Sequence, residues 1–213
     1  YRLALVPFVM VFAAGGVALL VDRWRKVPHI AWAAAIALAI ASNWPLHTAA
    51  SQIAITENNI GTALQDAERP SEAIDHYRRA LARAPDYAPA MNNLGTALRA
   101  AGHASEAIAI YDEAIAARPQ DETAYVNKGN ALMALGRTSD AIAVYRQAVA
   151  VAPRSSHATT ALANALYDDG TEAIQRGNYE RAVSPLKEAI ALRPGYGEAH
   201  NNLGQLLERT RQF

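Results

Sequence analysis

The sequence lacks the residues on which several kinds of chemistry depend. It contains no cysteine, which excludes disulfide bonds and thiolate nucleophiles. Its 20 basic and 20 acidic residues cancel, so no net field draws the chain to nucleic acid or to an anionic surface. The six histidines are scattered, without the spacing around a glutamate that holds zinc, and no glycine-rich phosphate-binding loop is present. We therefore expect no metal, no cofactor, no catalytic residue and no nucleic-acid partner.

Charged residues are also missing from two long stretches at the start of the chain. Residues 3–21 carry no charge, and as a helix they would span roughly 28 Å, about one hydrocarbon core. Residues 27–44 form a second uncharged stretch, which is rich in alanine. The favoured interpretation is a transmembrane helical hairpin within residues 1–46, with helices at 3–21 and 27–44. A pair of buried soluble helices is the alternative.

The polar break between these two stretches carries a sidedness signal. It contains Arg23, Arg25 and Lys26, and loops that carry positive charge stay in the cytoplasm. Both flanks of the hairpin should then face the other side of the membrane. The rest of the chain is therefore predicted to be periplasmic or extracellular.

The opening run YRLALVPFVMVFAAGG resembles the last transmembrane stretch of bacterial glycosyltransferases that use polyprenyl-phosphate sugars. Ala4 stands where that family often has proline. The resemblance implies a bacterial inner membrane, and it implies an alternative function as the C-terminal part of a multi-span glycosyltransferase. The catalytic carboxylates of that family lie in an early external loop that has no counterpart in this sequence, so no catalytic residue is carried over.

Beyond the hairpin, the chain repeats itself every 34 residues. Each unit contains two apolar-periodic segments of about 12 residues, separated by a turn, which predicts a pair of helices. Serines at residues 71, 105 and 139 indicate the capping zone of the second helix. The residues that recur at the same place in each unit are Gly61, Gly95 and Gly129, Tyr77, Tyr111 and Tyr145, and Pro85, Pro119 and Pro153.

Glycine at position 8, alanine at 20 and 27, tyrosine at 24 and proline at 32 resemble the pattern of the tetratricopeptide repeat. The resemblance implies an all-α fold, in which the transmembrane helical hairpin is followed by a right-handed α-solenoid of helix pairs. The predicted linker is 47–53, and the predicted repeat domain is 54–213. Its repeats are 54–87, 88–121, 122–155 and 163–196, followed by a partial repeat at 197–213.

The fourth repeat departs from the period by seven residues. Pro153 and Pro194 are 41 residues apart instead of 34. Because seven residues are about two helical turns, the insertion predicts a lengthened first helix from near His157 to Gln175. A looser loop at 154–160 is the alternative. The unit that follows stops at Phe213 and is interpreted as either a capping helix or a truncated repeat.

Asparagine recurs on the first helix of the units. Because an amide both donates and accepts hydrogen bonds, a row of amides along a concave surface can hold an extended peptide backbone. The NNLG strings resemble the tetratricopeptide repeats of the O-linked N-acetylglucosamine transferase type, which implies such a ladder at position 6. An alternative is that these amides only solvate the surface. The ladder consists of Asn59, Asn93, Asn127 and Asn202, with Asn58 and Asn92 at position 5, and Asp168 interrupts it.

Further first-helix residues should face the same concave groove, including Thr96, Arg99 and Asn130. They are mixed in character, and they contain no cluster of lysine and arginine that would clamp a terminal carboxylate. The sequence therefore predicts a membrane-tethered scaffold that binds a protein or an extended peptide, without catalysis in these residues. The alternative is the glycosyltransferase tail, whose repeats would position a substrate or a partner.

Overall fold

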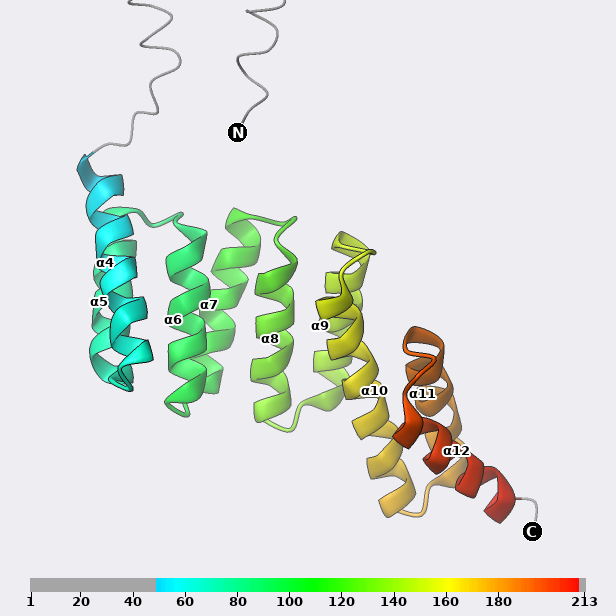
Figure 1. Cartoon of the computed structure of the whole chain (residues 1–213). Coiled ribbons are helices and arrows are strands. Elements are labelled where there is room, and N and C mark those ends of the chain that lie inside the picture. Colours follow the sequence, from blue (N-terminus) through cyan, green and yellow to red (C-terminus); the bar gives the residue numbers. More distant parts are fainter. Residues whose placement is uncertain (1–48, 211–213) are drawn as a thin grey trace, which may run out of the picture. The chain divides into compact units, whose positions relative to one another are not determined.

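The structure is a computed structural model that describes residues 49–210, and the predicted hairpin and residues 211–213 lie outside them. Within the described range every regular element is an α-helix (Figure 1). None of these helices is both long and apolar enough to cross a membrane. In chain order they are α4 (Ala49–Asp66), α5 (Pro70–Arg83), α6 (Ala88–Ala100), α7 (Ala104–Ala117), α8 (Glu122–Ala134), α9 (Thr138–Val151), α10 (Ser156–Gln175), α11 (Tyr179–Leu192) and α12 (Gly197–Thr210).

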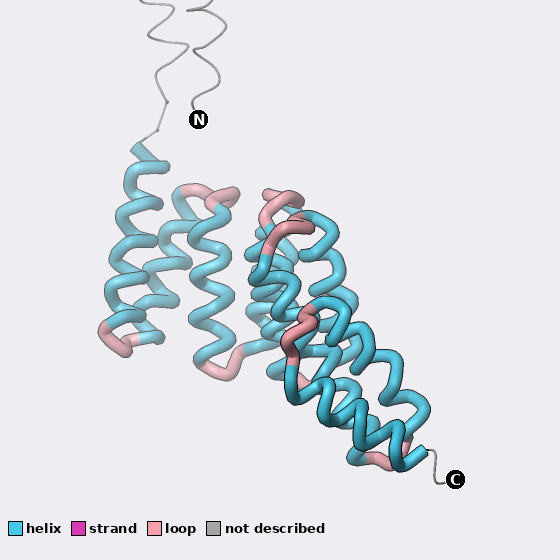
Figure 2. The backbone as a smooth tube through the Cα atoms, turned by 45° about the vertical axis from the view of Figure 1, so that its right-hand side comes forward, coloured by secondary structure: helices cyan, strands magenta, loops and turns pink. Residues whose placement is uncertain are grey.

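A left-handed residue ends the first helix of each complete repeat. Gly102 has a φ of +86°, and the His103 N–H donates to the Leu98 carbonyl at 2.8 Å, which is the 6→1 bond of a Schellman motif. Gly136 and Gly177 repeat this geometry. Glu68 takes the same place after α4 with a φ of +59°, although a side chain disfavours that conformation. These turns make the two helices of a repeat antiparallel (Figure 2).

The second helices start earlier than the serines predicted. The N-cap residues of α5, α7 and α9 are Arg69, His103 and Arg137, and none of these side chains makes a capping hydrogen bond. The serines at 71, 105 and 139 lie inside the first turn instead. The prediction was wrong because the left-handed turn residue directly before each cap sets the start of the helix, without help from a side chain.

Glycine and tyrosine bring the two helices of a repeat together. A Cβ atom on Gly95 would lie 2.5 Å from the Tyr111 ring, so only glycine fits at this place. Gly61 and Gly129 meet Tyr77 and Tyr145 in the same way. The rings are almost completely buried, and Tyr111 is 0% exposed. The 34-residue spacing of these residues is therefore a packing requirement.

The apolar core is continuous from repeat to repeat. One cluster joins Val126 of α8, Tyr145 of α9 and Leu162 of α10, and another joins Tyr77 of α5 to Leu98 of α6 and helices beyond. Each helix pair thus covers its neighbour, and the stability of the stack depends on contacts between adjacent repeats. The described helices form an all-α solenoid.

The first helices of the first and fourth repeats are longer than the other first helices. The helix α10 has 20 residues, whereas α6 and α8 have 13, so the insertion extends the helix and does not form a loop. The helix α4 starts at Ala49, so residues 49–53 of the predicted linker are helical. They contain no glycine or proline and include two alanines, which favours a helix. The repeat frame predicts packing positions and does not predict where a helix begins.

Candidate functional site

The first helices of successive repeats form one continuous surface, which we call the first-helix face (α4, α6, α8, α10 and α12). Each of these helices contacts the next first helix along the chain, from α4 to α12. Successive second helices make no comparable contacts in the described part of the chain. Because a stack curves toward the side on which its members approach most closely, the first-helix face is the inner side. All nine candidate site residues lie on its helices.

Tyrosine hydroxyls from the second helices reach polar side chains on this face. The partner in each repeat stands 15 residues before the tyrosine, at position 9 of the unit. Burial raises the pKa of all three hydroxyls, to about 12 for Tyr145, so they stay protonated. The bonded pairs are Tyr77 with Thr62 at 3.4 Å and with Gln65 at 3.3 Å, Tyr111 with Thr96 at 3.2 Å, and Tyr145 with Asn130 at 2.7 Å.

These hydroxyls orient two of the predicted site residues. Tyr145 donates its proton to Oδ1 of Asn130, which leaves the NH₂ group of that amide as a donor toward the face. The Thr96 hydroxyl also donates to the Asn92 carbonyl at 2.9 Å, so two hydrogen bonds fix the position of the Thr96 side chain. Sequence reasoning assigned the tyrosines to packing alone. Their constant 15-residue spacing from a polar residue was the signal that could have revealed this second role.

The asparagine ladder is used in part by the solenoid itself. Asn93 donates from Nδ2 to Oδ1 of Asn58 at 2.9 Å, and Asn58 is only 6% exposed. Asn202 donates in the same register to the Tyr167 hydroxyl at 3.2 Å. Both bonds join position 6 of one unit to position 5 of the unit before it. This part of the ladder therefore connects neighbouring first helices.

The interface between the second and third repeats has no such bond. Asn127 would meet Asn92 there, but no hydrogen bond between the two side chains is present. Asn92 donates instead to Asp121 at 3.3 Å, and its Oδ1 is buried without a partner. Asn59 is exposed at the start of the row, and Asn127 is half-buried. The structure thus brings Asn58 and Asn93 together and leaves the amides of Asn59 and Asn127 for other partners.

Two charged side chains on this face act on the same hydroxyl. Burial is the largest influence on the pKa of Tyr145, and then the positive charge of Arg99 lowers it and the negative charge of Asp168 raises it. Burial raises the pKa of the Tyr111 hydroxyl, and Thr96 and Arg99 lower it. Partial burial raises the pKa of the Asp168 carboxyl itself. The middle of the first-helix face is therefore polar and carries opposite charges on α6 and α10.

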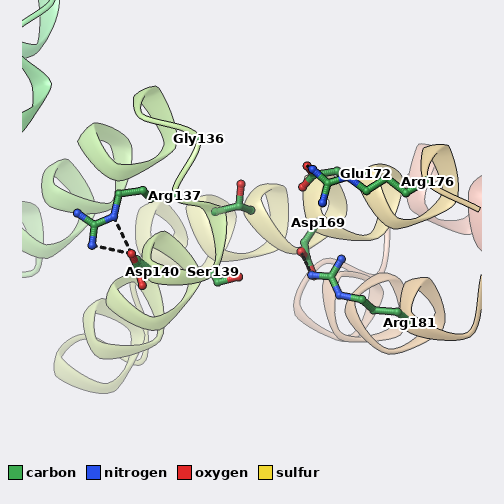
Figure 3. A pocket seen from close by; sticks show the side chains of 9 residues that line it. Gly136, Arg137, Ser139, Asp140, Asp169, Glu172, Arg176 and Arg181 are labelled. Carbon is green, nitrogen blue, oxygen red and sulfur yellow. Dashed lines mark hydrogen bonds and ion pairs between the residues drawn. The ribbon is translucent and has the colours of Figure 1, made fainter. Parts of the chain in front are cut away.

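Hollows are found at a different place, which the sequence did not predict. Two of them, of about 240 and 330 Å³, lie where α9, α10 and α11 meet. Figure 3 shows that ion pairs line one of them, including Arg137 with Asp140 and Arg181 with Asp169. The charges satisfy each other, so the hollow presents no unmatched group. Within residues 49–210 no group of side chains could hold a metal ion.

Solved structures share the fold at low sequence identity. The structure of MamA (41-end) from Desulfovibrio magneticus RS-1 is 22% identical, with a TM-score of 0.56 over 74% of this chain and 85% of that chain. The second TPR domain of human RPAP3, solved with the HSP70 peptide SGPTIEEVD, is 22% identical, with a TM-score of 0.52 over 55% and 97%. The first TPR of Spaghetti (RPAP3), bound to the HSP90 peptide SRMEEVD, has the same identity and TM-score over 59% and 98%.

The search of curated proteins found no match. The sequence does match the tetratricopeptide repeat family, over residues 52–120 and 120–195. These two ranges together run without a gap and cover more than half of the 213 residues. The match runs from the fourth residue of α4 to the turn that follows α11, so it includes both helices of every complete repeat apart from the first three residues of α4. The chain therefore belongs to the tetratricopeptide repeat family.

Proposed function

We propose that this protein is a scaffold that binds an extended segment of a partner protein along its first-helix face. The observation that carries the proposal is the set of amide groups that the solenoid does not use: the amides of Asn59 and Asn127 and the NH₂ group of Asn130. Asn59 lies on α4, and Asn127 and Asn130 lie on α8 of the same face, where Tyr145 orients the NH₂ group of Asn130. Amides along one face can pair with the alternating N–H and C=O groups of an extended chain.

The resemblance of the NNLG strings to one subtype of repeat supports the same function. In the O-linked N-acetylglucosamine transferase type, which the NNLG strings resemble, the position-6 ladder holds an extended polypeptide. In this chain the equivalent bonding is available at Asn127, whereas Asn93 is committed to Asn58. Two RPAP3 structures are solved with bound peptides, and they share the fold of this chain. These points favour backbone recognition on the inner face over a purely structural role for the whole ladder.

The test uses the full chain in detergent. The ligand is the decapeptide from a random library that binds this chain most tightly. Asn127→Ala should weaken binding of this peptide by about threefold to tenfold, since a lost hydrogen bond is worth about 1 kcal/mol. The matched control is Gln147→Ala, which removes an exposed amide from the second helix α9 and should leave the affinity unchanged. Thermal melting of both variants should equal that of the unchanged protein. Loss of affinity in Gln147→Ala but not in Asn127→Ala would contradict the proposal.

We further propose that residues 1–46 tether the scaffold to a membrane, with the repeats on the non-cytoplasmic side. The two uncharged stretches and the basic break between them support this arrangement. Alkaline phosphatase fused after Phe213 should be active, because this reporter works only outside the cytoplasm. An inactive fusion that is nevertheless produced and bound to membranes would refute the sidedness. The glycosyltransferase alternative rests on the opening residues alone and stays a prediction.

A further inference from the structure

We propose that Arg99 and Asp168 set the register of the bound segment, by taking an acidic side chain at Arg99 and a basic side chain at Asp168. The inference rests on the proposed function and goes beyond it, because it names the charge pattern of the ligand. Amide side chains that bond a peptide backbone do not distinguish one side chain of the segment from another. A segment could therefore shift by one repeat unless a second kind of contact distinguishes the repeats.

The first of the two charges stands among neutral groups. Two other polar residues of this face, Thr96 on α6 and Asn130 on α8, carry neutral hydroxyl and amide groups. Arg99 is half-buried and lies in the last turn of α6. None of the ion pairs formed by residues 49–210 includes Arg99. Its charge is thus available to a carboxylate of the ligand.

The second charge stands where the ladder is interrupted. Asp168 occupies position 6 of the fourth repeat, the place of Asn93 and Asn127 in the units before it. It is exposed and takes part in none of the ion pairs of the described chain, while its neighbour Asp169 pairs with Arg181. A carboxylate that is partly desolvated and unpaired gains from a cation that binds beside it.

The two charges lie close enough to be read by one ligand. Tyr145 packs against α8, whose neighbouring first helices are α6, which carries Arg99, and α10, which carries Asp168. Both charges influence the pKa of the Tyr145 hydroxyl. Neighbouring helices pack about 8–10 Å apart, so two steps from α6 to α10 are about 16–20 Å. An extended chain covers this distance in about five or six residues.

The experiment uses four synthetic decapeptides of serine, threonine and alanine, each with two test residues five positions apart. The test residues are Glu and Lys, Gln and Gln, Glu and Glu, or Lys and Lys. Binding to the full chain in detergent is measured by fluorescence anisotropy at low and at physiological salt. We expect the Glu and Lys peptide to bind about threefold to tenfold tighter than the Gln and Gln peptide, with the difference reduced by salt.

A change of specificity separates recognition of charge from damage to the fold. Asp168→Lys alters an exposed residue and should move the preference from the Glu and Lys peptide to the Glu and Glu peptide. Arg99→Gln should remove the preference for glutamate. Glu113→Lys, an exposed residue on the second helix α7, makes the same charge change as Asp168→Lys and should leave the order of affinities unchanged.

The outcomes distinguish the two proposals. Equal binding of all four peptides would overturn the register inference and leave peptide binding in place. Failure of all four peptides to bind would overturn both. If Glu113→Lys changes the order of peptide affinities as strongly as Asp168→Lys does, the peptides respond only to the net charge of the protein, and the inference would be wrong.

Discussion

The second and the fourth repeat solve the same packing problem with different residues. In the second repeat Gly95 admits the ring of Tyr111, and the hydroxyl of that ring bonds Thr96 at 3.2 Å. In the fourth repeat Gly170 admits Leu186, which is fully buried but has no polar group. A Cβ atom on either glycine would lie within 3.0 Å of the partner side chain, at 2.5 Å from Tyr111 and at 2.7 Å from Leu186, so the close contact at glycine does not need an aromatic ring.

The difference shows what the hydroxyl adds. Thr171 occupies the position in the fourth repeat that Thr96 occupies in the second. Because Leu186 occupies the position of the tyrosine, Thr171 has no tyrosine hydroxyl in its own repeat to bond. Asn202 from the next first helix takes that place, with contacts to Thr171 at 3.5 Å and to the Tyr167 hydroxyl at 3.2 Å. Tyrosine therefore couples the interior of a repeat to its first-helix face. Where leucine replaces it, the threonine at position 9 bonds an asparagine of the next repeat and not a tyrosine of its own repeat.

The largest expected effect comes from filling the space that glycine leaves. Gly95→Ala places a methyl group against the Tyr111 ring and should lower the free energy of unfolding by about 2 kcal/mol, measured by urea denaturation of helical circular dichroism. Gly170→Ala should have a similar effect, because its Cβ would meet Leu186 at 2.7 Å.

Gly204 provides the control for both substitutions. It occupies position 8 of the last unit, and no described atom lies within 4 Å of a Cβ built there. Gly204→Ala should therefore stabilise α12 by about 0.5–1 kcal/mol through helix propensity alone. Equal changes in the free energy of unfolding for Gly95→Ala and Gly204→Ala would mean that contact with the Tyr111 ring does not determine the effect of a methyl group at position 95.

A smaller effect is expected when the hydroxyl is removed and the ring is kept. Tyr145→Phe loses the 2.7 Å bond to Asn130 and should cost about 1 kcal/mol near neutral pH. In the unfolded chain the pKa of tyrosine is about 10, and burial raises the pKa of Tyr145 to about 12. The native state therefore holds this proton more tightly. The stability that this contributes is complete below pH 10 and is lost as the pH rises toward 12.

Urea denaturation at several pH values between 8 and 12 measures this contribution. The stability of the unchanged protein should fall more steeply above pH 10 than that of Tyr145→Phe. Parallel curves for the two proteins would show that the hydroxyl of Tyr145 is as easily ionised in the folded state as in the unfolded state.

The smallest effect concerns the turns, where the first repeat differs from the other three. Glu68→Gly should raise the free energy of unfolding by about 0.5–1 kcal/mol, because glycine adopts a φ of +59° without a steric penalty. The reciprocal change, Gly102→Ala, should lower it by about 1 kcal/mol. Thermal melting of both variants measures the difference. A destabilising Glu68→Gly would mean that the glutamate side chain makes a compensating contact.

Much of the fold could be predicted because the signals are local and repeated. The spacing of Gly95, Tyr111 and Pro119 identified the helix pairs, and the insertion of seven residues predicted the length of α10. The start of α4 could not be predicted in the same way, because a repeat frame contains no information about a helix that extends beyond it. The capping serines were assigned wrongly because turn geometry, and not side-chain chemistry, begins those helices.

The candidate site was predictable as a list of residues but not as a set of contacts. Position 6 identifies Asn93 and Asn127 as equivalent, and the structure separates them, since Asn93 bonds Asn58 while Asn127 bonds no neighbouring amide. The sequence by itself determined the period, the helix pairs and which residues lie on the first helices, because these follow from spacing along one chain. Only the tertiary structure decided which amides are already bonded and which charges share a hydroxyl, because those contacts form between residues that stacking brings together from different repeats.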